Sequence, residues 1–530
     1  MRPSTIDIRI HDRRTVPAPG AGRRLGRVLA PLVAVIALVV ACDDGSDEQS
    51  MDAFAEDPDC FGIELVELEA DQVRCGTVTA PLHHDDPDGE SITLAVATLT
   101  VQDISDEPVL VLGGGPGQAV IETALSEPVV RQGYAAAGRE VILLDQRGAG
   151  SSDPELACDD FADDGELDHD EIPSTRKQRD VLVACRDELV ERGVDLDAFD
   201  HGNNARDVDL VRRALGHEQL VLRGTSYGSH LALHAAALAP DGFAALVLSS
   251  PADPSDNYLE AGPGGFQAAL DRLDEACAQD QRCTDQLGGV HEAIDQLADR
   301  LADQPQQVTA TPLSGGEPVT RIYTPEVLLA AVFSMFYLAD GPFALPGSLI
   351  AAQQGDLQPL ASYAATFEER AAELPRGMSM SMICSGEGAT FDAEAAGAAL
   401  SSATLTEYWF DVSGVGGRAT TAVCWRWGVE PSFDPGQLEL APDIPTLLVT
   451  GEVDHVTPPV IGEQLHAQRS TSHLVEARGL GHAPLENLDV LADGCGSDIV
   501  TAFLDDPDRE PDTTCTRQIP SLDAIGQYLP

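Results

Sequence analysis

The segment at residues 224–228, Gly-Thr-Ser-Tyr-Gly, contains the serine whose surroundings best fit a nucleophile. Serine reacts poorly at neutral pH, so a catalytic serine has to be exposed and placed beside a base. A sharp turn from a strand into a helix exposes the hydroxyl, and crowding in that turn favours glycine two residues before and two residues after. The motif follows the apolar run Leu220–Leu222 and opens a helix-forming stretch. We therefore predict that Ser226 is the nucleophile of an acyl-transfer enzyme.

A serine of this kind is followed along the chain by an acid and then by a histidine. Asp454 comes shortly after the apolar run Thr446–Thr450, and His482 shortly after the run His473–Glu476. Both lie beyond the carboxyl ends of predicted strands, where open α/β sheets place their sites. We predict that His482 is the general base and then the general acid, and that Asp454 orients its imidazole. Alternatives stay open, with Asp253 or Glu452 as the acid and His455 or His473 as the base.

The oxyanion that forms during acyl transfer needs backbone N–H donors, and two places in the sequence can supply them. The first is the N–H of Tyr227 at the start of the predicted helix. The second is the loop Gly113–Gly117, whose glycines let the backbone approach a substrate closely; we choose Gly114, with Gly115 as the next candidate. A phosphate-binding role for this loop is excluded, because no Gly-Lys-Ser/Thr follows it.

The elements that must position these residues alternate between short apolar strands and helices. The predicted strands are Val73–Pro81, Ile92–Gln102, Val109–Leu112, Val141–Leu144, Leu220–Leu222, Ala244–Leu248, Thr446–Thr450 and His473–Glu476. This alternation predicts an α/β fold with a mostly parallel sheet and helices on both faces. Between residues 251 and 442 the pattern is helical, which predicts a large helical lid inserted into the sheet domain. We also expect Asn204 to cap a helix that stops at Gly216, and Arg147 to tie adjacent loops to Asp145 or a neighbour.

The amino-terminal residues have the pattern of an export signal. Arginines between residues 13 and 27 precede the apolar run Val28–Ala41, and Cys42 follows Val-Val-Ala. A basic region, a short apolar core and a small residue at its end are typical of a signal peptide. The cysteine resembles the lipid-modified residue of a bacterial lipoprotein, so we expect Cys42 to anchor an exported protein to the membrane of the cell envelope. An ordinary signal peptide with an incidental cysteine is the alternative.

We divide the chain into five segments on these grounds. Residues 42–59 are acidic and have few apolar side chains, so they are predicted to be a solvated tether. The full set is a signal peptide at 1–41, the tether at 42–59, the amino-terminal part of a catalytic α/β core at 60–252, the lid at 253–442 and the carboxy-terminal part of that core at 443–530.

Composition and cysteine spacing limit the ligands of this protein. With 32 basic and 88 acidic residues the formal net charge is −56, which repels phosphate backbones and argues against nucleic-acid binding. Apart from Cys42, ten cysteines remain, an even number that suits an oxidising compartment. We expect neighbours to pair: Cys60 with Cys75, Cys158 with Cys185, Cys277 with Cys283, Cys384 with Cys424 and Cys495 with Cys515. Neither Cys-x-x-Cys nor His-Glu-x-x-His occurs, so we predict no metal and no other cofactor.

Taken together, these motifs resemble the proline iminopeptidase and tripeptidyl aminopeptidase branch of the α/β hydrolases. The resemblance rests on residues 114–118 (Gly-Gly-Pro-Gly-Gln), 145–152 (Asp-Gln-Arg-Gly-Ala-Gly-Ser-Ser), 207–216 and 224–228, on Cys384, Cys424 and Trp427 in the lid, and on Cys495 and Cys515. It implies a serine exopeptidase that releases residues from peptides with a free amino terminus. No protein partner is predicted.

Such specificity requires a carboxylate that pairs with the ammonium group of the substrate. Glu387 and Glu486 are the candidates, and an exposed surface acid is the alternative for each. An esterase or amidase with the same triad is the second hypothesis, since a fold does not fix a substrate. A third hypothesis is a non-catalytic surface lipoprotein, against which the complete set of catalytic residues argues. A dehalogenase or epoxide hydrolase would have aspartate in place of Ser226.

Overall fold

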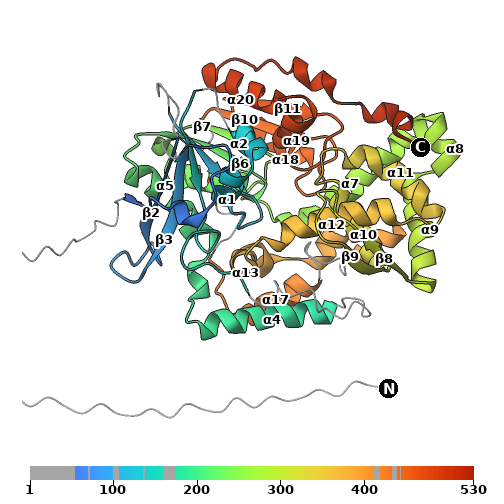
Figure 1. Cartoon of the computed structure of the whole chain (residues 1–530), viewed down its shortest axis with the longest axis horizontal. Coiled ribbons are helices and arrows are strands. Elements are labelled where there is room, and N and C mark those ends of the chain that lie inside the picture. Colours follow the sequence, from blue (N-terminus) through green and yellow to red (C-terminus); the bar gives the residue numbers. More distant parts are fainter. Residues whose placement is uncertain are drawn as a thin grey trace, which may run out of the picture. The chain divides into compact units, whose positions relative to one another are not determined.

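Nine strands form one sheet in the part of the chain that the computed structural model describes, residues 54–69, 72–99, 107–134, 138–158, 175–409, 418–432, 438–441 and 443–529. Their order is β1-β2-β3-β5-β4-β6-β7-β10-β11. The bounds are β1 Phe54–Glu56, β2 Val73–Pro81, β3 Ser91–Leu99, β4 Val109–Leu112, β5 Val141–Leu144, β6 Leu220–Thr225, β7 Phe243–Ser249, β10 Thr446–Gly451 and β11 Ser472–Ala477. Strands β5 to β11 in this order pair in parallel, whereas β1, β2, β3 and β5 pair antiparallel. The parallel strands therefore end at one edge of the sheet (Figure 1).

Helices cover both faces of this sheet (Figure 1). Successive strand residues point to opposite faces, so Leu110 and Leu112 of β4 belong to one buried cluster and Val109 and Val111 to clusters on the other side. Helices α5 (His201–Ala214), α6 (Tyr227–Leu238) and α18 (Pro459–Ala467) pack on the first face, and α1 (Val120–Ser126), α2 (Pro128–Tyr134), α19 (Pro484–Leu491) and α20 (Cys495–Asp505) on the second. The predicted α/β fold with a mostly parallel sheet is confirmed.

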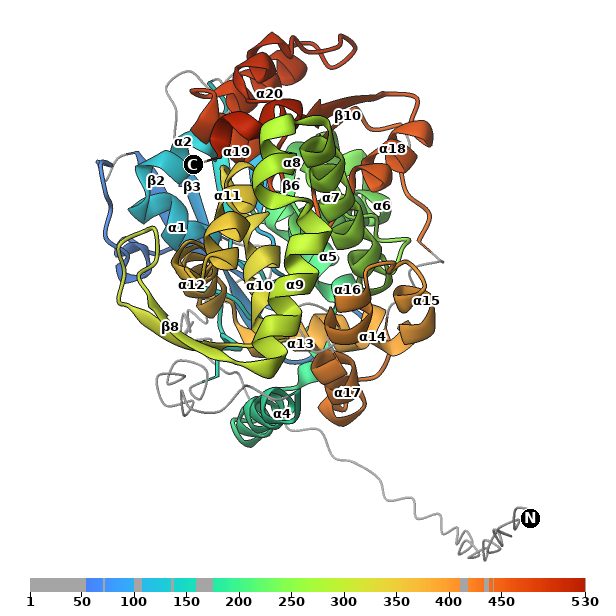
Figure 2. The same cartoon turned by 90° about the vertical axis from the view of Figure 1, so that its right-hand side faces the viewer.

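Between β7 and β10 the chain forms a mainly helical lid, which faces the viewer in Figure 2. Its helices are α7 Tyr258–Gln279, α8 Gln281–Leu287, α9 Val290–Asp303, α10 Pro325–Met335, α11 Gly341–Gln353, α12 Gln358–Ala372, α13 Arg376–Ser385, α14 Glu387–Thr390, α15 Ala393–Gly397, α16 Ala403–Tyr408 and α17 Arg418–Trp427. The purely helical prediction missed an antiparallel hairpin of β8 (Gln306–Ala310) and β9 (Val319–Tyr323). Val308 and Ala310 alternate with polar residues, so the hairpin turns one face toward α12.

Two local predictions differ from the structure. Helix α5 begins at His201, and its cap is Asp200 rather than Asn204, because the Asp200 side chain accepts the Asn203 N–H at 2.7 Å. Asn204 is buried and donates instead to Gln146 Oε1 at 2.8 Å. The predicted tether is too long, since Phe54–Glu56 forms β1 and pairs with β2.

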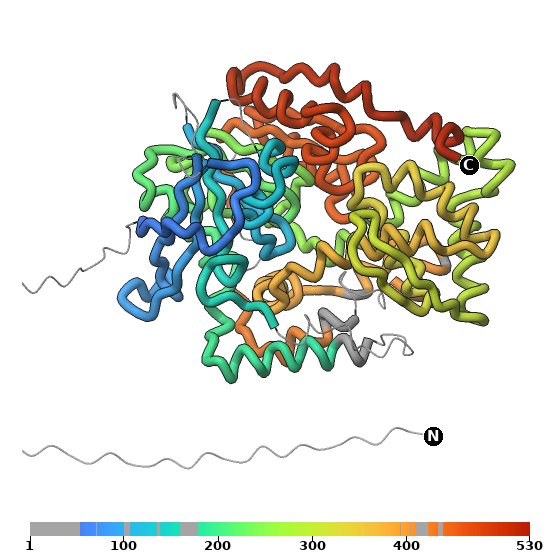
Figure 3. The backbone as a smooth tube through the Cα atoms, in the orientation of Figure 1, coloured from blue at the N-terminus to red at the C-terminus, as the bar shows by residue number. Residues whose placement is uncertain are grey.

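Disulfides join neighbouring cysteines as predicted, at Cys60–Cys75, Cys158–Cys185, Cys277–Cys283, Cys384–Cys424 and Cys495–Cys515. The chain beyond α20 runs from the sheet domain to the lid (Figure 3), where Arg282 of α8 donates to the carbonyls of Gly526 and Leu529. The predicted signal peptide and Cys42 lie outside the described residues. Within those residues, none of the helices combines the length and apolar character that a membrane crossing requires.

Candidate active site

Ser226 occupies a tight turn between β6 and α6. Its backbone has φ 57° and ψ −124°, a combination that non-glycine residues rarely adopt and that a functional turn can impose. A Cβ atom added at Gly224 would lie 2.2 Å from the carbonyl oxygen of Gly228, and one added at Gly228 would lie 2.1 Å from the carbonyl oxygen of Leu112. A side chain at either position would clash with the backbone, so both positions require glycine, as the motif predicts.

Asp454 and His482 form a buried acid–base pair beyond the ends of β10 and β11. His482 Nδ1 lies 2.9 Å and 3.0 Å from the two carboxylate oxygens of Asp454, and both residues are at most 4 % exposed. Burial alone would raise the pKa of Asp454, but the neighbouring His482 and its hydrogen bond hold that pKa well below its ordinary value. Asp454 is thus ionised, and it fixes the Nδ1 side of the imidazole so that Nε2 is left for chemistry.

The end of β7 connects Ser226 to this pair. The Ser226 N–H donates to the carbonyl of Ser249 at 3.0 Å. The hydroxyl of the next residue, Ser250, donates to Asp454 at 2.6 Å. Among the described residues, the structure records no hydrogen bond between the Ser226 hydroxyl and His482. The structure therefore links Asp454 to His482 directly, and it links Ser226 to this pair through the end of β7.

The glycine loop after β4 lies beside Ser226. A Cβ atom added at Gly114 would lie 3.4 Å from the Ser226 Cβ, whereas one added at Gly115 would meet Gly117 and Leu374. The Gly114 N–H points to Gln118 Oε1 at 3.3 Å. Tyr227, the candidate donor outside this loop, directly follows Ser226 as the first residue of α6. Gly114 is thus the closer of the two candidate donors in this loop to Ser226.

The alternative acids and bases have other roles in the structure. Asp253 accepts the N–H and hydroxyl of Ser255, and Glu452 pairs with Arg272 at 2.6 Å. His473 contacts the carbonyl of Pro507 at 3.0 Å. His455 is fully buried beside the aromatic rings of Phe333, Phe336 and Tyr337. Burial lowers the pKa of His455 to about 3, so it stays neutral.

Arg147 joins loops as predicted, but its acidic partner is Asp207. The guanidinium contacts both Asp207 oxygens, at 2.7 Å and 2.8 Å, and donates to the carbonyls of Leu82 and Ala198. Asp145 instead accepts the N–H groups of Ile121 and Ser151.

Glu387 forms a second buried carboxylate–imidazole pair, which we call the lid pair, with His201. Glu387 is fully buried, and its Oε2 lies 3.2 Å from His201 Nε2. His201 Nδ1 lies 3.1 Å from the Tyr227 hydroxyl, so the lid pair reaches the residue after the nucleophile. Among the described residues Oε1 of Glu387 has no hydrogen-bond partner, and His230 Nε2 lies 3.6 Å away. Nothing in the sequence around His201 indicated this contact.

Glu486 has a different environment from Glu387. Its two oxygens accept hydrogen bonds from Thr225 Oγ1 at 2.8 Å and from Ser249 Oγ at 3.0 Å. These hydroxyls stand directly before Ser226 and Ser250, at the ends of β6 and β7. Glu486 therefore fastens α19 to the two strand ends, and the structure does not favour it as a receptor for a substrate ammonium group.

The lid contacts the loops of the candidate site. Ser379 of α13 donates to the carbonyl of Pro116 in the glycine loop at 2.7 Å. The His482 N–H donates to the carbonyl of Phe336 at 2.9 Å, and the Tyr337 ring lies 5.1 Å from the His482 ring, edge to face. These contacts join the lid to the glycine loop and to the loop that carries His482.

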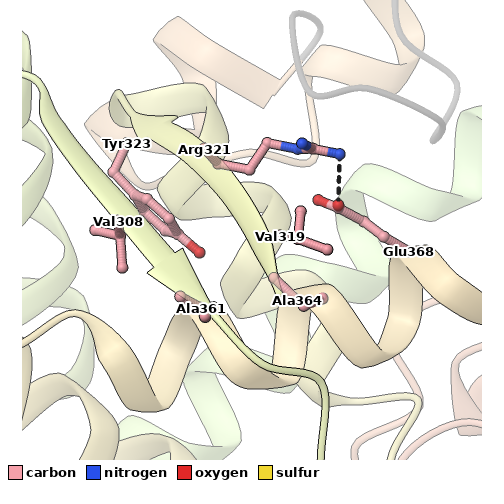
Figure 4. A pocket seen from close by; sticks show the side chains of 9 residues that line it. Val308, Val319, Arg321, Tyr323, Ala361, Ala364 and Glu368 are labelled. Carbon is pink, nitrogen blue, oxygen red and sulfur yellow. Dashed lines mark ion pairs between the residues drawn. The ribbon is translucent and has the colours of Figure 1, made fainter. Parts of the chain in front are cut away.

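A small hollow elsewhere in the lid is separate from the candidate site. It lies between the β8–β9 hairpin and α12, where Arg321 pairs with Glu368 at 3.0 Å (Figure 4). None of the predicted site residues lines this hollow. Within the described residues, no group of His, Cys, Asp and Glu side chains is arranged to hold a metal ion.

Comparison with known proteins agrees with the fold. Residues 107–285 match the α/β hydrolase fold family, and residues 413–515 match the TAP-like protein family. The chain is thus an α/β hydrolase by fold. More particularly, it is one with a TAP-like carboxy-terminal part, which confirms the resemblance that the sequence motifs predict.

Three relatives illustrate the match. Serine protease Hip1 of Mycobacterium tuberculosis is 26% identical over 288 residues, which cover 50% of this chain and 55% of the relative. The tripeptidyl aminopeptidase of Streptomyces lividans is 28% identical over 227 residues, 40% of this chain and 41% of the relative. Carboxylesterase B of M. tuberculosis is 24% identical over 288 residues, 50% and 49% of the two chains. The chain therefore spans about half the length of the curated relatives it matches.

Proposed function

We propose that the protein is a serine hydrolase that releases residues from the amino terminus of peptides through an acyl-enzyme on Ser226. The observation that carries this proposal is the buried Asp454–His482 pair, joined through the end of β7 to the turn that holds Ser226. Relatives named as a serine protease and a tripeptidyl aminopeptidase support the peptide substrate.

In the proposed reaction the Ser226 hydroxyl attacks the scissile carbonyl carbon while Nε2 of His482 accepts its proton. Asp454 stabilises the imidazolium through Nδ1. When the tetrahedral intermediate collapses, the C–N bond breaks and His482 returns the proton to the leaving amine. Water then attacks the acyl-enzyme with His482 again as the base, and Ser226 departs with the proton. No cofactor enters any step.

The developing oxyanion is proposed to bind the N–H groups of Tyr227 and Gly114. Tyr227 begins α6, and Gly114 lies against Ser226. The oxyanion would replace Gln118 Oε1 as the acceptor of the Gly114 N–H, a bond that is long at 3.3 Å. A donor of this kind contributes roughly 3 kcal/mol to the stability of the transition state.

Glu387 is proposed to pair with the substrate's amino terminus. It is a carboxylate of the lid whose Oε1 makes no hydrogen bond among the described residues and lies 3.6 Å from His230 Nε2, and His201 links it to Tyr227 beside the nucleophile. An ammonium group supplies the donors that Oε1 lacks, and a buried charge of opposite sign compensates the carboxylate. A peptide with a blocked amino terminus carries no ammonium group, so it can neither donate these hydrogen bonds nor compensate the charge of the carboxylate.

The test compares three substrates: a tripeptide nitroanilide with a free amino terminus, the same compound acetylated at that terminus, and a nitrophenyl ester. We expect cleavage of the free compound, little cleavage of the acetylated one, and loss of both in Ser226→Ala. Ser381→Ala is the matched control, because it removes a buried hydroxyl that accepts a hydrogen bond from Trp427 at 2.9 Å and leaves the triad intact. Unchanged turnover in Ser226→Ala would refute the proposal.

An esterase is the second candidate, favoured by the relative named carboxylesterase B. It uses the same nucleophile, so Ser226→Ala abolishes its activity as well. Rapid turnover of the nitrophenyl ester, together with no cleavage of free-amine peptides of any length, would select this candidate over the peptidase.

We also propose that Cys42 carries a lipid that anchors the exported protein. We propose too that the core predicted at 60–252 and 443–530, with β1 (Phe54–Glu56) added at its start, is interrupted in the sequence by the lid at 253–442. The arginines, apolar run and Val-Val-Ala-Cys sequence support the anchor, and the departure of the chain from the sheet after β7 and its return at β10 support the division. Metabolic labelling with an alkyne fatty acid should mark the wild type and spare Cys42→Ala. Equal labelling of the two proteins would exclude the anchor at this cysteine.

A further inference from the structure

Ser250 lies directly after β7 in a conformation that serine seldom adopts. Its φ is 51°, a left-handed value that is uncommon outside glycine, asparagine and aspartate, and the residue is completely buried. Holding a residue in such a conformation costs free energy, and this strain tends to occur at functional sites. The serine side chain therefore needs a function that glycine, which would fit the backbone more easily, does not supply.

The Ser250 hydroxyl makes two hydrogen bonds that bridge two loops of the site. It donates to Oδ2 of Asp454 at 2.6 Å and accepts the N–H of Ala483 at 2.9 Å. Ala483 follows His482, and its own φ is 60°. One side chain thus holds the carboxylate of the acid and the backbone beside the base.

The remaining donors to Asp454 explain why this bridge matters. The N–H groups of Val456 and Thr457 and the Thr457 hydroxyl also bind its carboxylate, at 2.9–3.0 Å. All three belong to the loop that carries Asp454, so they shape that loop but do not position it against the rest of the site. Ser250 belongs to a different segment, directly after β7, and the carbonyl of its neighbour Ser249 accepts the Ser226 N–H at 3.0 Å.

We infer that Ser250 is a positioning residue, which orients the Asp454 carboxylate and the His482 loop toward Ser226 through its hydroxyl. This inference rests on the proposed function, since it assigns a role within the same triad. It predicts that loss of the hydroxyl slows the chemical step and leaves substrate binding unchanged.

Two substitutions separate the hydroxyl from the backbone. Ser250→Ala removes the hydroxyl and keeps a Cβ atom at positive φ, whereas Ser250→Gly removes the hydroxyl and also relieves the backbone strain. Ser152→Ala is the matched control, because Ser152 is also buried, donates to the carbonyl of Asp145 at 2.7 Å and accepts the Ala95 N–H at 2.9 Å. Melting temperatures of all three variants are measured beside their kinetics.

We expect kcat to fall on the order of tenfold in both Ser250 variants, the loss that one hydrogen bond to a charged group commonly produces, with KM within about twofold of the wild type. The rate at which a fluorophosphonate probe labels Ser226 should fall by a similar factor. Ser250→Gly should melt at a higher temperature than Ser250→Ala and yet be just as slow. Ser152→Ala should keep the wild-type kcat whatever its melting temperature.

The inference is overturned if Ser250→Gly keeps the wild-type kcat and labelling rate, because the backbone alone would then explain the residue. It is equally overturned if the loss lies in KM, or if Ser152→Ala slows as much. The labelling rate keeps this result distinct from a failure of the proposed function. If the wild type cleaves no peptide but its Ser226 reacts with the probe, the comparison of labelling rates still decides the role of Ser250.

Discussion

The acid–base pair and the lid pair are both buried contacts between a carboxylate and an imidazole, yet they differ in how many donors the carboxylate receives. Asp454 accepts from His482, Ser250, Val456 and Thr457, so both of its oxygens are occupied. Glu387 has His201 on one oxygen and, within the described residues, no hydrogen bond on the other.

This difference means that the Asp454 carboxylate is already fixed in place, whereas the Glu387 carboxylate can still accept a hydrogen bond from a ligand. A carboxylate with every oxygen occupied is held in one orientation, which suits a group that must keep an imidazole in a single tautomer. A buried carboxylate with an unused oxygen is costly in the empty protein and gains when a donor arrives. The first arrangement suits chemistry, and the second suits recognition of a cationic substrate group.

The largest effect is expected from Asp454→Asn, which removes the carboxylate of the acid–base pair. Asparagine can present an amide donor to Nδ1 and stabilise the wrong tautomer of His482, so kcat should fall by roughly 10⁴. Steady-state kinetics on the free-amine nitroanilide measure the loss. Glu452→Gln, at the rival acid, should keep kcat within a few-fold; a larger loss there than in Asp454→Asn would reassign the acid.

A smaller and more selective effect is expected from Glu387→Gln, which replaces the carboxylate of the lid pair with an amide. The kcat/KM for the free-amine peptide should fall about 100-fold, as expected for loss of one partner of a buried charge pair, whereas the acetylated peptide and the ester should change little. Glu486→Gln is the matched control, and its effect should be the same on free and blocked substrates. An equal loss on both substrates in Glu387→Gln would contradict a role in recognition.

The smallest effect concerns stability and the histidine beside the first pair. Burial lowers the pKa of His455 to about 3, against an ordinary value of about 6.5, while Asp454 and His482 are its charged or titratable neighbours. The unfolded chain therefore binds a proton that the folded protein excludes, and stability is lost as the pH falls from about 6.5 toward 3. The variant His455→Phe has no titrating group at this position and therefore serves as the reference.

Urea unfolding at pH 7.5 and pH 5.0 measures this contribution. The wild type should lose about 2 kcal/mol more than His455→Phe over that interval, since 1.4 kcal/mol corresponds to one pH unit below the ordinary pKa. Equal losses in the two proteins would show that His455 is protonated in the folded state or is exposed to solvent.

The same two regions show what a sequence can predict about this protein. Ser226, Asp454 and His482 follow short apolar strands, and the local pattern of residues was enough to place each of them just beyond a strand end. Gly224 and Gly228 are fixed by the space in one turn, which is also a local property.

Other features depend on contacts between segments that are far apart in the sequence. His201 and Glu387 are 186 residues apart and meet only because the lid packs on α6 and α5. Ser250 looks like any serine at the end of a strand until its distance to Asp454 is known. The sequence prediction missed the β8–β9 hairpin although Val308 and Ala310 alternate with polar residues, because this short segment lies between long helical patterns. It chose Asn204 over Asp200 because both residue types cap helices.

Mass spectrometry of the protein after reaction with a fluorophosphonate identifies the nucleophile and shows which residues activate it. We expect a single phosphonyl adduct on Ser226, formed at a rate that drops sharply in His482→Ala and in Asp454→Asn, whereas Glu452→Gln reacts like the wild type. An unmodified Ser226, or labelling that is indifferent to His482 and Asp454, would contradict this expectation.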